Sequence, residues 1–111
     1  MSGPTNPAGL SFTAPVTFTD GTAIPPGTIV KFQYGFGTAT GQYASPPVDD
    51  TVMKTVGGKV ATTIPTTLGF GQWFAAARSV TKDGAISAWG NEISFVLAPK
   101  TPSPINDFQA A

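Results

Sequence analysis

The sequence predicts an all-β fold, an antiparallel β-sandwich of about seven short strands with a flexible arm at each end. Its 111 residues include 13 Gly and 11 Pro, a share that opposes long helices because Gly loosens a helix and Pro breaks it. Short runs alternate between apolar and polar side chains with a period of two, which is typical of strands that bury one face. Turn signals such as Asp20-Gly21 and Asp83-Gly84 separate these runs.

The chain begins with a polar segment punctuated by Pro, residues 1–8, which we expect to form an extended arm. The sandwich is expected to span residues 9–98. Its clearest strands are the alternating runs at residues 30–36, 60–64, 73–79 and 93–97. In the first of these runs the pattern places Val30, Phe32, Tyr34 and Phe36 on the core side.

Residues 99–111 hold three Pro within six residues, so we expect a second extended arm that pairs with no strand. This arm carries Ile105 and Phe108, two apolar side chains that a purely solvating tail would not need. We interpret them as candidate docking residues that anchor on a neighbouring subunit. The alternative is that both side chains fold back onto the domain's own sandwich.

Composition excludes several classes of function. Six Lys and Arg balance six Asp and Glu, which leaves no basic surface for nucleic acid or for an anionic membrane. The chain has no His and no Cys, so disulfides, thiolate chemistry and nearly all zinc sites are excluded. Ser and Thr are abundant, but nothing is present to activate a hydroxyl. We therefore expect no enzymatic activity, no metal and no cofactor.

Three short motifs have a plainer structural interpretation than a chemical one. Asp49-Asp50 is a carboxylate pair, but adjacent side chains tend to point apart, and a solvated loop is expected. The glycines of the segment 35–41 indicate a hairpin turn, because neither phosphate-binding spacing is satisfied. Lys82-Asp83-Gly84 is expected to form a tight turn.

A sugar-binding platform and core packing are alternative roles for five aromatic residues, which are Phe36, Tyr43, Phe70, Trp73 and Trp89. Trp73 and Phe36 are expected in the core, where aromatic side chains dominate packing. Trp89 is expected to cap one end of the core. Tyr43 and Phe70 fall on predicted turns and remain, with the two apolar residues of the C-terminal arm, candidate partner-docking residues.

Three segments resemble bacterial fibronectin type III domains over about residues 8–98. Leu10-Ser11-Phe12-Thr13-Ala14-Pro15 resembles the family's opening strand, with Phe12 at the position of a Trp. Residues 32–43 resemble its central strand and the turn that follows. Ser87-Ala88-Trp89-Gly90-Asn91-Glu92-Ile93 resembles the approach to its last strand. The family usually has a Tyr where Trp73 stands, and that hydroxyl ties the corner before the strand to the backbone.

The resemblance implies fold more than function, and two hypotheses remain open. The segment before Lys31 has neither a basic residue nor an apolar core of the kind that directs export. We therefore expect a bacteriophage virion protein, assembled in the host cytoplasm, whose partners are capsid or tail subunits. The resemblance also allows a carbohydrate-binding or adhesion module that contacts glycans of the host surface. Neither hypothesis involves nucleic acid or a membrane.

Overall fold

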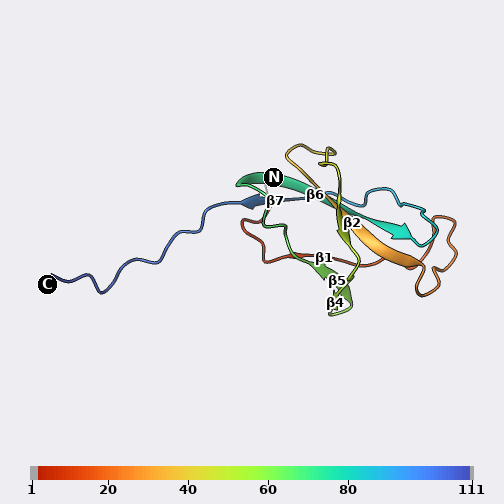
Figure 1. Ribbon diagram of the computed structural model, residues 1–111, viewed down its shortest axis with the longest axis horizontal. Helices are drawn as coiled ribbons and strands as arrows, with labels where there is room; N and C mark the ends of the chain where they lie inside the picture. The colour runs from red at the N-terminus through yellow and green to blue at the C-terminus, as the bar shows by residue number, and fades with distance from the viewer. Residues whose placement is uncertain (1–2, 111) are drawn as a thin grey trace.

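The computed structural model describes residues 3–110, and over this range it is all-β, with two antiparallel sheets packed face to face (Figure 1). The predicted sandwich fold class is therefore confirmed. One sheet has four strands in the order β3-β2-β6-β7, and the other has three in the order β1-β5-β4. The strands are β1 (Leu10–Phe12), β2 (Ile29–Gly37), β3 (Val48–Asp50), β4 (Thr55–Val56), β5 (Lys59–Thr62), β6 (Gly71–Thr81) and β7 (Ile93–Leu97).

The core lies between the two sheets and is built from the apolar side of the alternating runs. Strand β2 contributes Phe32, Tyr34 and Phe36, each at most 5% exposed, which agrees with the pattern read from the sequence. Phe95 of β7 is the most deeply buried, and Phe12 of β1 meets Phe32 edge to face with ring centroids 4.9 Å apart. Such aromatic contacts add specific geometry to the burial of apolar area.

The start of β2 departs from the predicted alternation. A register shift between Ile29 and Lys31 inserts Val30 as an unpaired residue against β6. Such a bulge changes which side chains face the core. Ile29 consequently packs against the core cluster, whereas Val30 is 40% exposed. The prediction that Val30 faces the core is wrong for this reason.

The N-terminal segment is extended, as predicted, but it is not a free arm. The Asn6 amide donates to the Val96 carbonyl (2.7 Å), and the Val96 amide donates to the Pro4 carbonyl (2.9 Å). The Asn6 side chain then bonds both backbone groups of Ala98, at 3.0 Å each. The described part of this segment therefore lies along the outer edge of β7 and fixes the point where the C-terminal arm begins.

The connection between β6 and β7 also remains attached to the sheet. Lys82-Asp83-Gly84 forms the predicted tight turn, in which the Gly84 amide donates to the Thr81 carbonyl (3.0 Å). Residues 85–90 then run back beside β6, with hydrogen bonds such as that from the Gly90 amide to the Ala77 carbonyl (2.9 Å). One edge of β6 is thus covered along most of its length.

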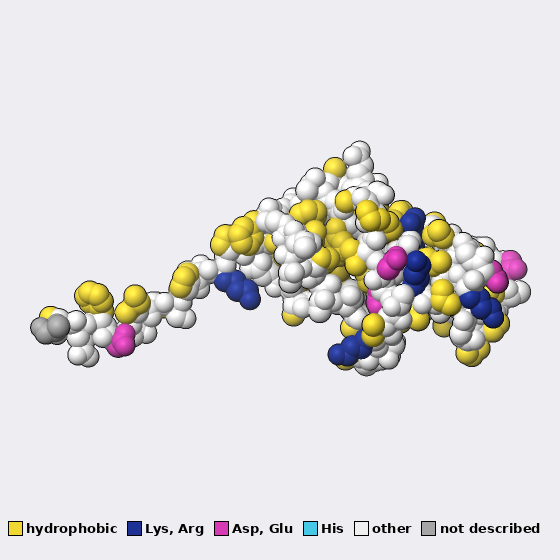
Figure 2. All heavy atoms as spheres, viewed as in Figure 1, with side chains coloured by type: hydrophobic (Ala, Val, Ile, Leu, Met, Phe, Trp, Pro, Cys, Tyr) yellow, Lys and Arg dark blue, Asp and Glu magenta, His cyan; other side chains and the backbone are white. Residues whose placement is uncertain are grey.

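Residues 99–110 leave the end of β7 as an extended, exposed segment that joins no strand (Figure 1). The whole molecule measures 72 × 29 × 23 Å, and this arm accounts for the long dimension. Figure 2 shows apolar side chains spaced along it, clear of the domain.

Candidate interaction surfaces

The four predicted docking residues do not gather at one place. Ile105 and Phe108 stand on the C-terminal arm with exposed fractions of 76% and 89%. Phe70, 72% exposed, immediately precedes Gly71, whose backbone pairs with Leu97, so it stands at the end of the domain from which the arm leaves. Tyr43 is half-buried in a different environment, on the outer face of the four-stranded sheet.

Two glycines of β2 create the space for Tyr43. A Cβ at Gly35 would lie 2.7 Å from the Tyr43 Cγ, and one at Gly37 would overlap the Gln42 carbonyl. The chain can therefore fold back closely over the outer face of its own strand. Gly41, with φ near +72°, makes the turn that permits this return. The predicted hairpin turn is confirmed, although the first two glycines belong to the strand.

A carboxylate holds this returning loop in place. Glu92 Oε1 accepts hydrogen bonds from the Gly41 amide (2.7 Å) and the Tyr43 hydroxyl (2.9 Å), and its other oxygen accepts from the Thr40 hydroxyl. These donors, the Gly41 amide first, lower the pKa of Glu92 below its usual value. Desolvation, followed by the hydrogen bond to Glu92, raises the pKa of Tyr43.

A chain of polar contacts crosses the same face. The Arg78 guanidinium lies over the Trp89 ring, 4.3 Å from its centroid, and Arg78 Nε donates to Gln33 Oε1 (2.8 Å). Gln33 Nε2 donates to Asp49 Oδ1 (2.9 Å), and Lys31 Nζ lies 3.2 Å from Asp49 Oδ2. The hydrogen bonds from Gln33 and then Lys31 lower the pKa of Asp49. Lys31 and Asp49 form an ion pair in this arrangement, while the Arg78 guanidinium contacts the neutral Gln33 amide and the Trp89 ring.

The aromatic pair on this face does not form an open platform for a sugar ring. Trp89 meets Tyr43 edge to face, with centroids 5.0 Å apart, and Arg78 covers a face of its ring. The far end of the indole would lie 3.1 Å from a Cβ at Gly35, so Trp89 packs on the outside of the sheet. The expectation that Trp89 caps the core is wrong, because the loop at residues 85–90 runs along the sheet and not across its end.

The two adjacent aspartates point apart, as expected, but they lie on β3 and not on a loop. Asp49 points to the outer face, where it contacts Gln33 and Lys31. Asp50 Oδ2 instead accepts a hydrogen bond from the hydroxyl of the core residue Tyr34 at 2.6 Å. Asp50 Oδ1 also accepts from the Met53 amide (3.0 Å). Burial is the main cause that raises the pKa of Tyr34 far above its ordinary value. Within residues 3–110 no three potential metal-ligating side chains gather at one point.

At the corner before β6, the indole N–H of Trp73 makes the kind of hydrogen bond that the fibronectin type III resemblance predicts for a tyrosine hydroxyl. Its indole N–H donates to the Gly69 carbonyl four residues upstream (2.9 Å). A fibronectin-type corner uses a hydroxyl for the same kind of return to the backbone. The corner before β6 is therefore tied by an indole, while the ring packs against the core as predicted.

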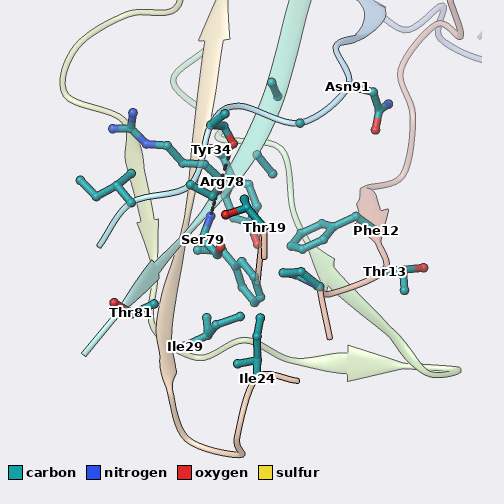
Figure 3. Close-up of a pocket in the computed structure, with 18 of the residues that line it drawn as sticks. Phe12, Thr13, Thr19, Ile24, Ile29, Tyr34, Arg78, Ser79, Thr81 and Asn91 are labelled. Carbon is teal, nitrogen blue, oxygen red and sulfur yellow. Dashed lines mark hydrogen bonds between the residues drawn. The ribbon is translucent and has the colours of Figure 1, made fainter. Parts of the chain in front are cut away.

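An apolar groove that the sequence did not reveal opens between the sheets beside β1 (Figure 3). Its volume is about 580 Å³. Arg78 contributes to the lining, but its guanidinium is turned away toward Trp89. The core residues Phe32 and Tyr34 belong to the lining, and the larger apolar side chains around them include Leu10, Phe12, Phe18, Ile24, Ile29, Ile86 and Ile93. Ile86 and Ile93 remain 54% and 42% exposed, so the groove presents apolar surface to solvent.

One signal of this groove is present in the sequence. The inner face of β6 carries Ala75, Ala77 and Ser79, three small side chains in succession. Small residues on a core face leave space unless the opposite sheet fills it, and β1 is only three residues long. Ile24 and Ile86 lie outside the alternating runs, so their contribution could not be recognised from periodicity.

Comparison with known proteins gave no match to a protein-family model, to a curated protein or to a solved structure. The resemblance to fibronectin type III domains therefore remains a prediction from the sequence. In residues 3–110, no helix has the length and apolar character needed to cross a membrane.

Proposed function

We propose that this protein is a non-enzymatic structural subunit of a bacteriophage particle, a capsid decoration or tail-associated protein that docks through its C-terminal arm. The observation that carries the proposal is the arm itself, in which Ile105 and Phe108 stand in solvent beyond a folded domain. Exposed large apolar side chains on an extended segment are costly to keep in water, and docking on a partner removes that cost.

The rest of the molecule supports a docking role for the arm. Asn6 and β6 hold the last strand from both sides, so the arm starts from a fixed point on a rigid domain. A segment that becomes ordered on binding can cover a long path on its partner. A net charge of zero and a low share of charged residues, 11%, suit close packing of many copies, since neighbouring subunits would not repel one another.

The assignment to a phage particle comes from the sequence resemblance. Small fibronectin-like and immunoglobulin-like domains are common on phage capsids and tails, and their partners are other virion proteins. The proposed location is the virion, after assembly in the host cytoplasm. Glycan binding receives less support, since the Trp89 and Tyr43 rings are packed against each other, with Arg78 over the Trp89 ring.

The test is quantitative mass spectrometry of purified particles assembled with the full chain or with a chain lacking residues 100–111. The proposal expects the full chain to be present at a defined copy number and the truncated chain to be lost from particles. Isolated truncated protein should keep its melting temperature, which separates lost docking from lost folding. Absence of the full chain from particles, or equal incorporation of both chains, would refute the proposed role of the arm.

A matched pair of point variants sharpens this test. Phe108→Asp places a charge at an exposed apolar position of the arm, while Asn106→Asp places the same charge two residues away. We expect the first variant to be depleted from particles and the second to be incorporated normally. Equal behaviour of the two variants would mean that the apolar side chain is not what docks.

A further inference from the structure

The C-terminal arm carries its apolar residues at a spacing of three. Pro99, Pro102, Ile105 and Phe108 recur at this interval, and the residues that follow each of them are Lys100, Ser103, Asn106 and Gln109. The polyproline II conformation has three residues per turn and a rise of about 3.1 Å per residue. In that conformation the four apolar residues form one continuous ridge, beside a row that is entirely polar. A β-strand would instead place Ile105 and Phe108 on opposite sides.

The groove beside β1 has the size and chemistry to receive such a ridge. Its volume of about 580 Å³ is within the range that holds a small ligand, which leaves room for a few side chains but not for a folded domain. Its lining includes the aromatic residues Phe12 and Phe18, and Pro-rich segments in this conformation commonly dock against aromatic residues. Neither the ridge nor the apolar side of the groove carries a charge that docking would have to bury.

The geometry of the arm's exit favours a groove on another molecule. The Asn6 side chain forms hydrogen bonds with both the amide and the carbonyl of Ala98, so the direction of the chain is set just before Pro99, where the arm begins. The groove lies toward the other end of the same strand, because its lining includes Ile93, the first residue of β7. An arm that returned to its own groove would have to reverse within residues 99–104, where three Pro stiffen the chain.

We propose that the ridge of one C-terminal arm docks, in the polyproline II conformation, into the β1 groove of a second copy of this chain. The inference rests on the proposed function, because it names the partner of the arm on the assembled particle. Arm and groove are different surfaces, so the contact is head to tail and produces rings or open chains of subunits. Two main anchoring side chains make each contact weak, with a dissociation constant on the order of a millimolar. Many such contacts on a lattice reinforce one another.

The experiment uses paramagnetic relaxation in a mixture of two full-length chains at high concentration. One chain is ¹⁵N-labelled, and the other carries a nitroxide at Gln109→Cys, a unique label because the natural chain has no Cys. The expected result is loss of signal at the amides of Phe18, Ile86 and Ile93 in the ¹⁵N-labelled chain. Dilution should restore these signals.

Paired variants identify the two sides of the contact. Ile105→Asp in the spin-labelled chain, or Ile86→Asp in the ¹⁵N-labelled chain, should abolish the signal loss. The controls Asn106→Asp on the arm and Val52→Asp on the domain should retain it; Val52 is 81% exposed and does not line the groove. Loss of the effect with a control variant would overturn the assignment of ridge or groove.

Other outcomes overturn the proposal in distinguishable ways. Signal loss that appears only when label and ¹⁵N are on the same chain, and that resists dilution, would mean that the arm occupies its own groove. Signal loss elsewhere on the domain, or none at millimolar concentration, would mean that the groove is not its receptor. If particle incorporation still required the arm, the proposed function would stand and the arm's partner would be a different virion protein.

Discussion

The two tryptophans of this chain are placed on opposite faces of the same sheet. Trp73 points inward, packs against the core and donates its indole N–H to Gly69 at 2.9 Å. Trp89 lies on the outer face between Tyr43 and Arg78, where it is half-buried. The packing partners therefore decide what each ring contributes, and a substitution at either position tests a different part of the structure.

Trp89→Ala should destabilise the domain but leave the packing of the core between the sheets intact. Because the ring is half-buried, we expect the free energy of unfolding to fall by about 1–3 kcal/mol, less than for a fully buried Trp. Urea denaturation measures this change. Phe70→Ala is the control, since Phe70 is 72% exposed and its loss should be nearly neutral. Equal effects at the two positions would mean that the outer-face packing around Trp89 contributes nothing.

Glu92 should make the domain less stable in acid. Its pKa is lowered in the folded state from the usual value of 4.5 by the Gly41, Thr40 and Tyr43 donors. A lowered pKa stabilises the fold fully above the unfolded value, and this stabilisation is lost as pH falls through the folded value. Glu92→Gln should therefore flatten the fall in the free energy of unfolding below about pH 4.5.

The control for this measurement is Asp107→Asn, which removes a carboxylate from the exposed arm. It should leave the dependence of unfolding on pH unchanged. A pH profile that is the same for Glu92→Gln and the natural chain would contradict the role assigned to the Glu92 hydrogen bonds.

At the scale of elements, the N-terminal segment acts as an additional edge of the four-stranded sheet. Asn6→Gly should lower the free energy of unfolding by about 1–3 kcal/mol, because it removes two hydrogen bonds to Ala98. Gly tolerates the positive φ of this position, near +49°, so the variant isolates the side-chain bonds from backbone strain. Hydrogen exchange should show faster exchange at the Ala98 amide. Unchanged exchange at the Ala98 amide would contradict the role assigned to the Asn6 side chain.

The loop that returns over β2 can pack closely because Gly37 has no side chain. Gly37→Ala should destabilise the domain by about 1–3 kcal/mol or more, because the added Cβ meets the backbone of Gln42 and not a movable side chain. Gly69→Ala is the matched control, since nothing lies within 4 Å of its Cβ position. Thermal unfolding of both variants compares them. A similar melting temperature for the two would mean that the loop can shift at little cost.

The sequence predicted the elements whose pattern is local and regular. Period-two alternation located β2, β5, β6 and β7, and Gly with Asp located the turn before residue 85. Alternation could not show the bulge at Val30, because the extra residue depends on pairing with a strand far along the chain. Strands β3 and β4 have three and two residues, too few for a pattern to emerge.

The candidate surfaces were less predictable than the fold. Ile105 and Phe108 stand out within a polar, Pro-rich segment, so the arm was recognised from composition alone. The groove depends on how β1, the segment 13–24 and the segment 85–93 approach one another, and no local pattern encodes that approach. Tyr43 was singled out as a docking residue, but its contact with Trp89 exists only once the loop folds over Gly35.

At the scale of the whole molecule, the arm dominates the overall dimensions. The radius of gyration of the Cα atoms is 18.2 Å, whereas a compact chain of this length has about 13 Å. Removal of residues 100–111 should bring the radius measured by small-angle X-ray scattering close to the compact value. The melting temperature should not change, because residues 99–110 are exposed and form no strand. A fall in melting temperature would mean that the arm packs on the domain in solution.

The pairing of β7 on both sides also determines how the domain responds to mechanical load. A pull on the C-terminal arm acts along β7, which is bonded to β6 on one edge and to the segment from Pro4 to Asn6 on the other. Force in that direction shears both rows of hydrogen bonds together, whereas a perpendicular pull would open them one at a time. A subunit tethered by this arm would therefore resist extraction better than its small core alone suggests, and single-molecule force spectroscopy should record a lower rupture force for Asn6→Gly.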